Sequence, residues 1–160
     1  MFPIETTTLR ARPWPAYLLM AISGLVFIPR FFFLPEKTGG VMYIGIGLFI
    51  FSIIVWFLLS KSRIIIDDAG LNYKTVFTTK EVLWNSVSKT YLKYRQHGRS
   101  GSYYWYFENP YGRKIKFPIR LYSRKNLRTI AEALTTKCQN ADIERRIYDM
   151  AEGQFPWYIW

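Results

Sequence analysis

The chain has 160 residues, of which half are hydrophobic and 19% aromatic, and it carries 22 Lys and Arg against 11 Asp and Glu. This length is typical of about one domain. The charges are unevenly distributed, because residues 13–59 contain only Arg30, Glu36 and Lys37 as charged residues. Such a division excludes a disordered chain and an ordinary soluble globular protein. It indicates a membrane anchor that carries a basic, aromatic-rich domain.

Two apolar runs predict a transmembrane helical hairpin over residues 14–60. Residues 39–59 contain no charge, and 21 helical residues span roughly 30 Å, the thickness of a bilayer's hydrocarbon core. The first run, residues 16–34, contains Pro29, where we expect a kink, and Arg30, whose side chain can snorkel to the headgroups. A cleaved signal peptide is disfavoured because no A-x-A-like site follows. The short connection places both ends of the hairpin on one side of the membrane.

The positive charges that flank these runs predict the orientation. Four lie at the outer ends and two near the connection: Arg10, Arg12, Lys61 and Arg63, against Arg30 and Lys37. Because positive residues accumulate on the cytoplasmic side, we expect a multi-pass inner-membrane protein with cytoplasmic N- and C-termini. Residues 1–13 would then be a cytoplasmic N-terminal segment. The single cysteine, Cys138, excludes an intramolecular disulfide, as expected for a domain in a reducing compartment.

Residues 61–137 are predicted to form a mostly antiparallel β domain that is covered by one helix. The predicted strands are residues 63–67, 71–77, 81–84, 87–95, 103–108 and 114–119, and residues 96–102 are predicted to form a flexible polar loop. The helix is capped by Ser123 and places four apolar residues on one face: Leu127, Ile130, Ala131 and Leu134. Residues 138–160 are expected to form a short helix over 141–152 and an aromatic tail.

Two segments resemble those of bacterial pleckstrin-homology-like (PH-like) domains. Residues 64–71 (IIIDDAGL) resemble the hydrophobic strand, acidic turn and Gly-Leu pair with which such domains open. Residues 82–87 (VLWNSV) are similar to the apolar-x-Trp-x-x-apolar sequence that precedes their long strand. Many such proteins place a two-helix membrane hairpin directly before the domain. The resemblance covers residues 14–137 and implies a membrane α+β protein with an antiparallel PH-like barrel or sandwich and a C-terminal helix.

The same resemblance bears on function. It implies a non-enzymatic, membrane-proximal scaffold or interaction module, and it contributes no catalytic residues. Eukaryotic lipid-binding PH domains bind phosphoinositides through a basic loop between their first two strands. Here the corresponding residues, 67–70 (DDAG), are acidic and short, which argues against a specific phosphoinositide pocket.

The strongest functional signal is a set of basic residues that share faces of the predicted strands and helix. The candidates for binding anionic lipid or a partner are Lys89, Lys93, Arg95, Lys114, Lys116, Arg120, Arg124, Lys125 and Arg128. The last three lie near a helix N-terminus, which already carries partial positive charge, so they are best explained if they face anions. Each basic residue near an anionic leaflet contributes about 1 kcal/mol. A solvated basic face without a ligand fits the pattern equally well.

The C-terminal tail is a second candidate site. It contains four large aromatic side chains: Phe155, Trp157, Tyr158 and Trp160. Aromatic residues at a chain end fray into water unless something holds them. We expect the membrane interface, the protein's own domain or a partner protein to do so.

The sequence contains no pattern typical of an enzyme, a metal site or a cofactor site. His97 lies in the predicted polar loop, Cys138 follows a helix end without a motif, and Asp67 and Asp68 are predicted to shape a turn. We therefore expect no catalysis, no metal and no cofactor. Nucleic acid is not expected as a partner, because the βαβ units of an RNA-recognition module are missing and the chain has an anchor.

Two functional hypotheses follow. In the first, the hairpin anchors a PH-like domain that binds a protein partner, membrane lipids or both, and the Gly-rich start of the second run allows homo-oligomers. In the second, the chain is a membrane-resident immunity protein that neutralises a toxin delivered by neighbouring cells. The compact size, the anchor and the aromatic tail are compatible with this alternative.

Overall fold

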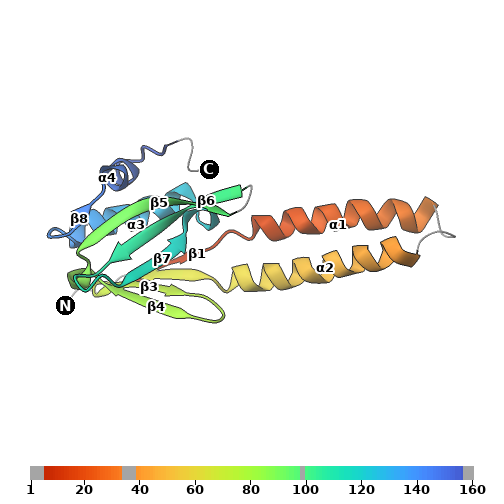
Figure 1. Ribbon diagram of the computed structural model, residues 1–160, viewed down its shortest axis with the longest axis horizontal. Helices are drawn as coiled ribbons and strands as arrows, with labels where there is room; N and C mark the ends of the chain where they lie inside the picture. The colour runs from red at the N-terminus through yellow and green to blue at the C-terminus, as the bar shows by residue number, and fades with distance from the viewer. Residues whose placement is uncertain (1–5, 34–38, 98–99, 157–160) are drawn as a thin grey trace. The chain divides into compact units, whose positions relative to one another are not determined.

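The chain is an α+β protein with two four-stranded sheets and four α-helices, as seen in a computed structural model that describes residues 6–33, 39–97 and 100–156 (Figure 1). It divides into two units. Unit 1 comprises residues 1–11 and 62–160, and unit 2 comprises residues 12–61. Unit 1 contains both sheets and its own hydrophobic core. Unit 2 is built from two apolar helices.

The helices of unit 2 are α1 (Trp14–Phe33) and α2 (Gly39–Ser60), which lie side by side and antiparallel (Figure 1). Their buried described residues are all small: Ala16, Ser23, Gly45 and Ser52. On each helix the two buried residues are seven positions apart, a spacing that returns to the same helix face. Small residues let helix backbones approach closely. The hydroxyls of Ser23 and Ser52 donate to carbonyls of their own helices, at 2.8 and 2.6 Å, so no polar group of these serines is left without a partner.

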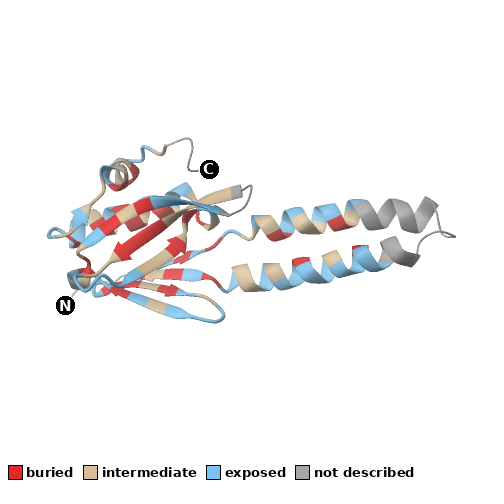
Figure 2. Ribbon diagram, viewed as in Figure 1, coloured by how far each residue is buried: buried red, intermediate tan, exposed pale blue. Residues whose placement is uncertain are grey.

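Many described residues of unit 2 are exposed (Figure 2), and a large share of them are large and apolar. The exposed ones include Leu18, Ile22, Leu25, Ile44, Phe49, Ile50, Phe51, Ile53, Ile54 and Phe57. By length and composition, one of the described helices can cross a membrane, through residues Tyr43–Ser60, whereas the described apolar part of α1, Trp14–Leu25, is shorter. The structure therefore contains one candidate span, and the second span of the predicted hairpin stays a prediction.

The first sheet, sheet A, contains β1 (Thr7–Arg10), β2 (Arg63–Ile66), β3 (Gly70–Lys74) and β4 (Thr79–Leu83), in that order and all antiparallel. The sequence did not predict β1. It pairs with β2 so that Arg10 lies opposite Arg63, and the Ala11 N–H donates to the Ser62 carbonyl at 3.0 Å. The chain thus leaves sheet A after β1 and returns to the neighbouring strand after unit 2.

The turn between β2 and β3 is held by Asp67. Its Oδ1 accepts hydrogen bonds from the backbone N–H groups of Ala69 (3.0 Å) and Gly70 (2.7 Å), as the sequence predicted for a turn-shaping aspartate. The buried indole of Trp84 donates to the Asp67 carbonyl at 3.0 Å. Gly70 has to be glycine, because a Cβ atom there would lie 2.2 Å from the Val82 carbonyl oxygen. These contacts link the turn at residues 67–70 to the segment that contains Trp84, because the indole bonds to Asp67 and Gly70 lies against Val82.

The second sheet, sheet B, contains β5 (Lys89–His97), β6 (Ser100–Glu108), β7 (Lys114–Pro118) and the short β8 (Asp142–Ile143), in the order β7-β6-β5-β8. The first three are antiparallel neighbours, and β8 runs parallel to β5. The predicted loop at residues 96–102 is wrong, because β5 and β6 remain paired as far as His97 and Ser100. Backbone hydrogen bonds hold this extension, so it needs no apolar alternation.

Two further predictions need correction. The last predicted strand ends at Pro118, so Arg120 lies in the 3₁₀ turn η3 (Ile119–Leu121) and not on β7. The helix predicted at residues 141–152 begins later, as α4 (Arg145–Ala151), because β8 takes up its first residues. The Glu144 side chain accepts a hydrogen bond from the Leu92 N–H at 2.7 Å, and Arg146 donates to the Leu92 carbonyl at 2.9 Å. These side chains continue the pairing of the β5 edge beyond β8.

The predicted helix α3 (Arg124–Lys137) is confirmed. The Ser123 hydroxyl accepts from the Asn126 N–H at 3.0 Å, and the four predicted apolar residues are buried. They pack in one core with the inward side chains of both sheets, among them Trp105, Phe107 and Phe117. Ile147 and Met150 of α4 join the same core. Sheet B therefore has one face on this core.

Candidate binding surface on sheet B

The outer face of sheet B is formed by alternate residues of its strands. On β5, Thr90 and Leu92 are buried, whereas Lys89, Lys93 and Arg95 are exposed, as the period of two predicted. On β6, Trp105 and Phe107 point into the core, so Tyr104, Tyr106 and Glu108 face the other way. On β7, Lys114 and Lys116 occupy the positions beside Glu108 and Tyr106. These residues, with Tyr91 and Asp142, are called the sheet B face below.

The strand register arranges the sheet B face in rows across the sheet. The first row contains Asp142, Lys89, Glu108 and Lys114. The second contains Tyr91, Tyr106 and Lys116, and the third Lys93 and Tyr104. Arg95 follows on β5, opposite Ser102. The sequence did not reveal that β6 separates the two predicted basic strands and places aromatic side chains between them.

The first row is internally neutralised. Lys89 Nζ lies 2.7 Å from Asp142 Oδ2, and Lys114 Nζ lies 3.3 Å from Glu108 Oε2. The hydrogen bond to Asp142 raises the pKa of Lys89, and the hydrogen bond to Glu108 raises the pKa of Lys114. Both ion pairs are solvent-exposed, so they contribute little to stability. Two of the nine predicted basic residues are thereby satisfied within the domain.

The remaining rows combine positive charge with tyrosine rings. The rings of Tyr91 and Tyr106 stack with centroids 5.2 Å apart and planes 2° apart. The Arg95 guanidinium lies 5.7 Å from the Tyr106 centroid, and the Lys116 ammonium lies 5.1 Å from that of Tyr104. Among the described residues, no ion pair is formed by Lys93 or Lys116. Five basic and two acidic side chains give the whole face a net charge of +3.

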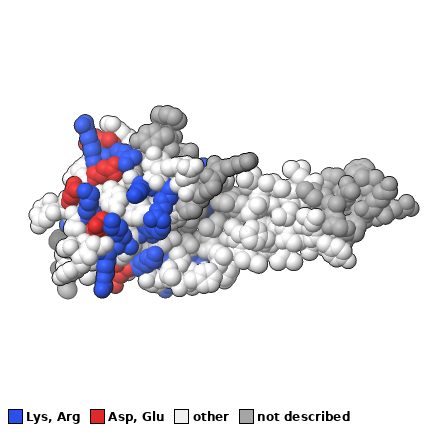
Figure 3. Space-filling view, viewed as in Figure 1, with Lys and Arg blue, Asp and Glu red and all other residues white. Residues whose placement is uncertain are grey.

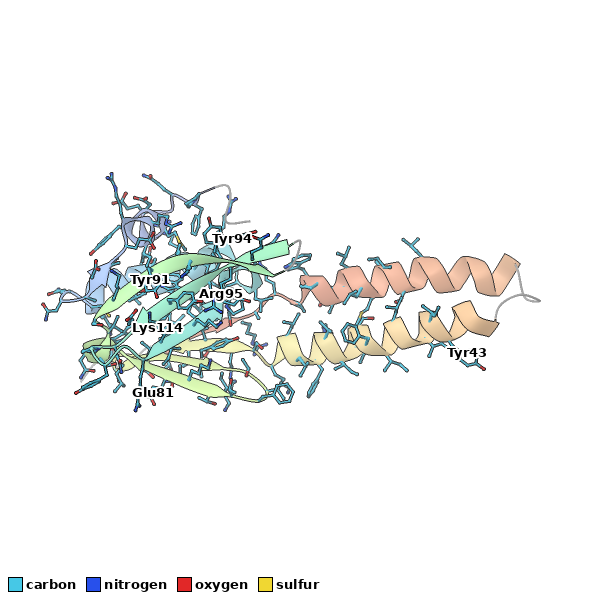
Figure 4. The ribbon with its side chains drawn as sticks, viewed as in Figure 1. Tyr43, Glu81, Tyr91, Tyr94, Arg95 and Lys114 are labelled. Atoms are coloured by element: carbon cyan, nitrogen blue, oxygen red, sulfur yellow. The ribbon has the colours of Figure 1, made fainter. Side chains whose placement is uncertain are left out.

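The figures show the same arrangement. In Figure 3, Lys and Arg gather with fewer Asp and Glu over the strands of sheet B, whereas the described surface of α1 and α2 is almost free of charge. Figure 4 shows Tyr91, Arg95 and Lys114 over β5, β6 and β7. Tyr106 is 4% exposed, and its hydroxyl has no hydrogen-bond partner in the described part of the chain. An unpartnered buried hydroxyl is rare in native proteins.

The other predicted basic residues lie elsewhere. Arg120, Arg124 and Lys125 are exposed around the N-terminus of α3, which packs on the core side of sheet B. There the Asn126 side-chain amide donates to the Arg10 carbonyl at 3.2 Å, which connects the helix start to the end of β1. Arg128 pairs with Glu132 at 2.8 Å and donates to the Ala151 carbonyl at 3.2 Å. The predicted basic residues thus belong to two separate surfaces, the sheet B face and the surface around α3.

The predicted tail is only partly described. Phe155 is half-buried and packs against the core of unit 1. Trp157, Tyr158 and Trp160 lie outside the described residues. The predicted contact of the tail with a membrane or a partner therefore stays a prediction, and the immunity hypothesis, with which the tail is compatible, stays one as well.

A cleft of 690 Å³ lies beside Trp84 and the end of α3, lined among others by Asp68, Lys137, Cys138 and Asn140. Asp68 and Lys137 form an ion pair. Burial raises the pKa of the Cys138 thiol to about 11, which keeps the sulfur protonated and a poor nucleophile at neutral pH. No group of three or more potential metal ligands occurs within residues 6–33, 39–97 and 100–156.

Comparison with protein-family models, curated proteins and solved structures finds no match for this chain. The class of this protein therefore follows from its structure alone. It is an α+β protein in which an apolar helical pair is inserted between the first two strands of a two-sheet domain.

Proposed function

We propose that this protein is a non-enzymatic, membrane-anchored binding module. In this proposal α1 and α2 cross the cytoplasmic membrane as a hairpin, and unit 1 is a PH-like domain on the cytoplasmic face that binds a protein partner, anionic lipid or both. The observation that carries the proposal is the exposed apolar surface of α2. Ten or more large apolar side chains in contact with water would be strongly unfavourable, at about 25 cal/mol per Å² of apolar area.

The path of the chain supports a hairpin anchor. Strands β1 and β2 are adjacent and antiparallel, so the segment that connects them, residues 12–61, leaves and re-enters sheet A at the same end of these two strands. A single membrane crossing would separate its ends by a bilayer thickness, whereas two crossings return them to one side. The apolar α1, with 20 residues, is long enough for the second crossing.

The order of elements in unit 1 supports a PH-like domain. Strands β1 to β4 and β5 to β7 form two antiparallel meanders, and α3 follows them and covers the core. The resemblance of residues 64–71 and 82–87 implies antiparallel strands followed by one covering helix, but it placed the helical hairpin before the whole domain, whereas β1 precedes α1 and α2. The acidic turn at Asp67 is tightly hydrogen-bonded, which argues against a phosphoinositide pocket there.

A lipid contact is supported by basic residues that flank residues 12–61 in the chain. Arg10 and Arg63 lie opposite each other on β1 and β2, two residues before and two residues after this segment. If residues 12–61 are inserted, chain connectivity keeps both arginines near the headgroups. Each contributes about 1 kcal/mol on an anionic leaflet.

The anchor and its orientation can be tested together. Full-length protein in native membranes is expected to resist extraction with alkaline carbonate. A cysteine introduced at Phe77, which is 81% exposed in unit 1, is expected to react with a membrane-impermeant maleimide only after the cells are permeabilised. A cysteine introduced at Lys37, between the helices, is expected to react in intact cells. Release by carbonate, or labelling at Phe77 in intact cells, would contradict the proposal.

A further inference from the structure

We infer that the sheet B face is a docking site for an acidic, aromatic-containing segment of a partner protein. Its centre is formed by Tyr91, Lys93, Arg95, Tyr106 and Lys116. This inference rests on the proposed binding function and specifies the chemistry of the partner. It concerns a surface that the membrane-anchor argument does not use.

Charge complementarity determines the sign of the partner. The first row of the sheet B face is neutralised by its own ion pairs, Lys89 with Asp142 and Lys114 with Glu108. The other rows, with Lys93, Lys116 and Arg95, contain no acidic side chain of the sheet B face. A partner that runs along the strands, from one row to the next, meets a neutral region at one end and a cationic region at the other. Such an asymmetric field favours carboxylates at a defined position of the bound segment.

The aromatic side chains favour a protein over a simple polyanion. Tyrosine and arginine are enriched in protein interfaces because they bury large, rigid area with a polar end. Here the half-buried Tyr91 ring stacks on the buried Tyr106 ring, and the Arg95 guanidinium lies 5.7 Å from the Tyr106 centroid. The Tyr106 hydroxyl is buried and lacks a partner among the described residues. If the flexible Arg95 or Lys116 side chain moves aside, this hydroxyl can donate to a carboxylate of the segment.

Lipid headgroups are a weaker candidate for this face. The groups that chain connectivity keeps near the headgroups are Arg10 and Arg63, each two residues from an end of residues 12–61. The sheet B face is carried by β5, β6 and β7, and sheet B contains neither β1 nor β2. Lipid is thus assigned to Arg10 and Arg63, and an acidic protein segment to sheet B.

The test uses the full chain in nanodiscs of phosphatidylcholine, which carry no net charge. The probes are a random copolymer of glutamate and tyrosine and, for comparison, polyglutamate of the same length, with binding measured by fluorescence anisotropy at several salt concentrations. We expect the copolymer to bind more tightly than polyglutamate. The double variant Lys93→Glu/Arg95→Glu is expected to weaken copolymer binding at least tenfold. Tyr91→Ala is expected to remove the preference for the copolymer.

The matched control reverses two exposed charges outside the face, in the variant Lys74→Glu/Arg145→Glu. It has the same net charge as the test variant and is expected to change binding by less than twofold. Equal weakening in both variants would show non-specific charge attraction and overturn the inference. So would absence of copolymer binding in the wild type, or a loss of binding to anionic nanodiscs specific to the Lys93/Arg95 variant, which would make this face a lipid surface.

Thermal unfolding of each variant separates loss of the site from loss of the fold. Because Lys93 and Arg95 are exposed, the unfolding temperature of their double variant is expected to stay close to that of the wild type, whereas Tyr91→Ala also removes the stacking on Tyr106. The membrane proposal is tested independently of this inference, because carbonate extraction reports on the helices and not on sheet B. A protein that is released by carbonate and still binds the copolymer in a Lys93- and Arg95-dependent way would overturn the anchor alone.

Discussion

The membrane anchor makes a quantitative prediction at Ile50. This residue lies near the middle of the 22-residue α2, which is about 33 Å long at 1.5 Å per residue. Its side chain is 52% exposed, so it faces the surroundings of the helical pair. If α2 spans the bilayer, Ile50 is in contact with the hydrocarbon core, and an arginine there would be roughly 15 Å from either end of the helix.

The expected cost follows from insertion scales. An isoleucine at the centre of a membrane helix contributes about −0.3 to −0.6 kcal/mol, and an arginine about +2.5 to +3.5 kcal/mol. Ile50→Arg should therefore disfavour insertion by about 3–4 kcal/mol, which corresponds to a factor of roughly 100 to 1000 in the insertion equilibrium. In a water-exposed helix the same substitution would have a small effect, because about half of Ile50 is already exposed.

The assay is synthesis of the chain in the presence of membranes, followed by alkaline carbonate extraction and quantitation of the pellet. Wild-type protein is expected in the pellet, and Ile50→Arg is expected to move a large fraction to the supernatant. Phe77→Arg provides the control, because Phe77 is exposed in unit 1, between β3 and β4. An Ile50→Arg variant that partitions like the wild type, or a wild-type chain that is itself extracted, would refute the argument.

Three further predictions concern unit 1. Gly70→Ala places a Cβ atom against the Val82 carbonyl oxygen and is expected to destabilise the fold by several kcal/mol, measured by denaturant unfolding in detergent, whereas an unchanged midpoint would contradict the close approach. Thr90→Val removes the acceptor of the buried Trp105 indole N–H, 2.8 Å away, and should cost about 1–3 kcal/mol, and the effect should shrink in a Trp105→Phe background. The pKa of the Cys138 thiol is raised from 9.0 to about 11 in the folded protein, so the thiol of the unfolded chain ionises at a lower pH. The free energy of unfolding should therefore fall as pH rises from about 9 to 11, and a Cys138→Ala variant should lose that part of the pH dependence.

The sequence by itself determined the local elements. Alternation of apolar and polar residues located six strands to within a few residues, and the spacing of Leu127, Ile130, Ala131 and Leu134 defined the buried face of α3. The same alternation assigned Lys89, Lys93 and Arg95 to one face of β5. These predictions succeeded because side-chain direction in a strand or helix follows from backbone geometry alone.

Other elements depended on pairing between distant residues. Strand β1 has one buried apolar residue, Leu9, and becomes a strand because β2 presents an edge beside it, although more than 50 residues separate the two in sequence. The tip of the β5–β6 hairpin is polar and is held by backbone hydrogen bonds. Strand β8 is only two residues long and exists through its contact with β5. None of these has a periodic pattern that sequence reasoning can detect.

The candidate binding surface was likewise predictable from the sequence only in part. The sequence located the basic residues, but tertiary structure decided which of them lie together. It placed β6 between the two basic strands, which brought Tyr104 and Tyr106 among the lysines, paired Lys89 and Lys114 with acidic neighbours, and moved Arg124 and Lys125 to another face. The physical reason is that a strand's own sequence sets which side chains share a face, whereas sheet order and helix packing set which strands and helices become neighbours.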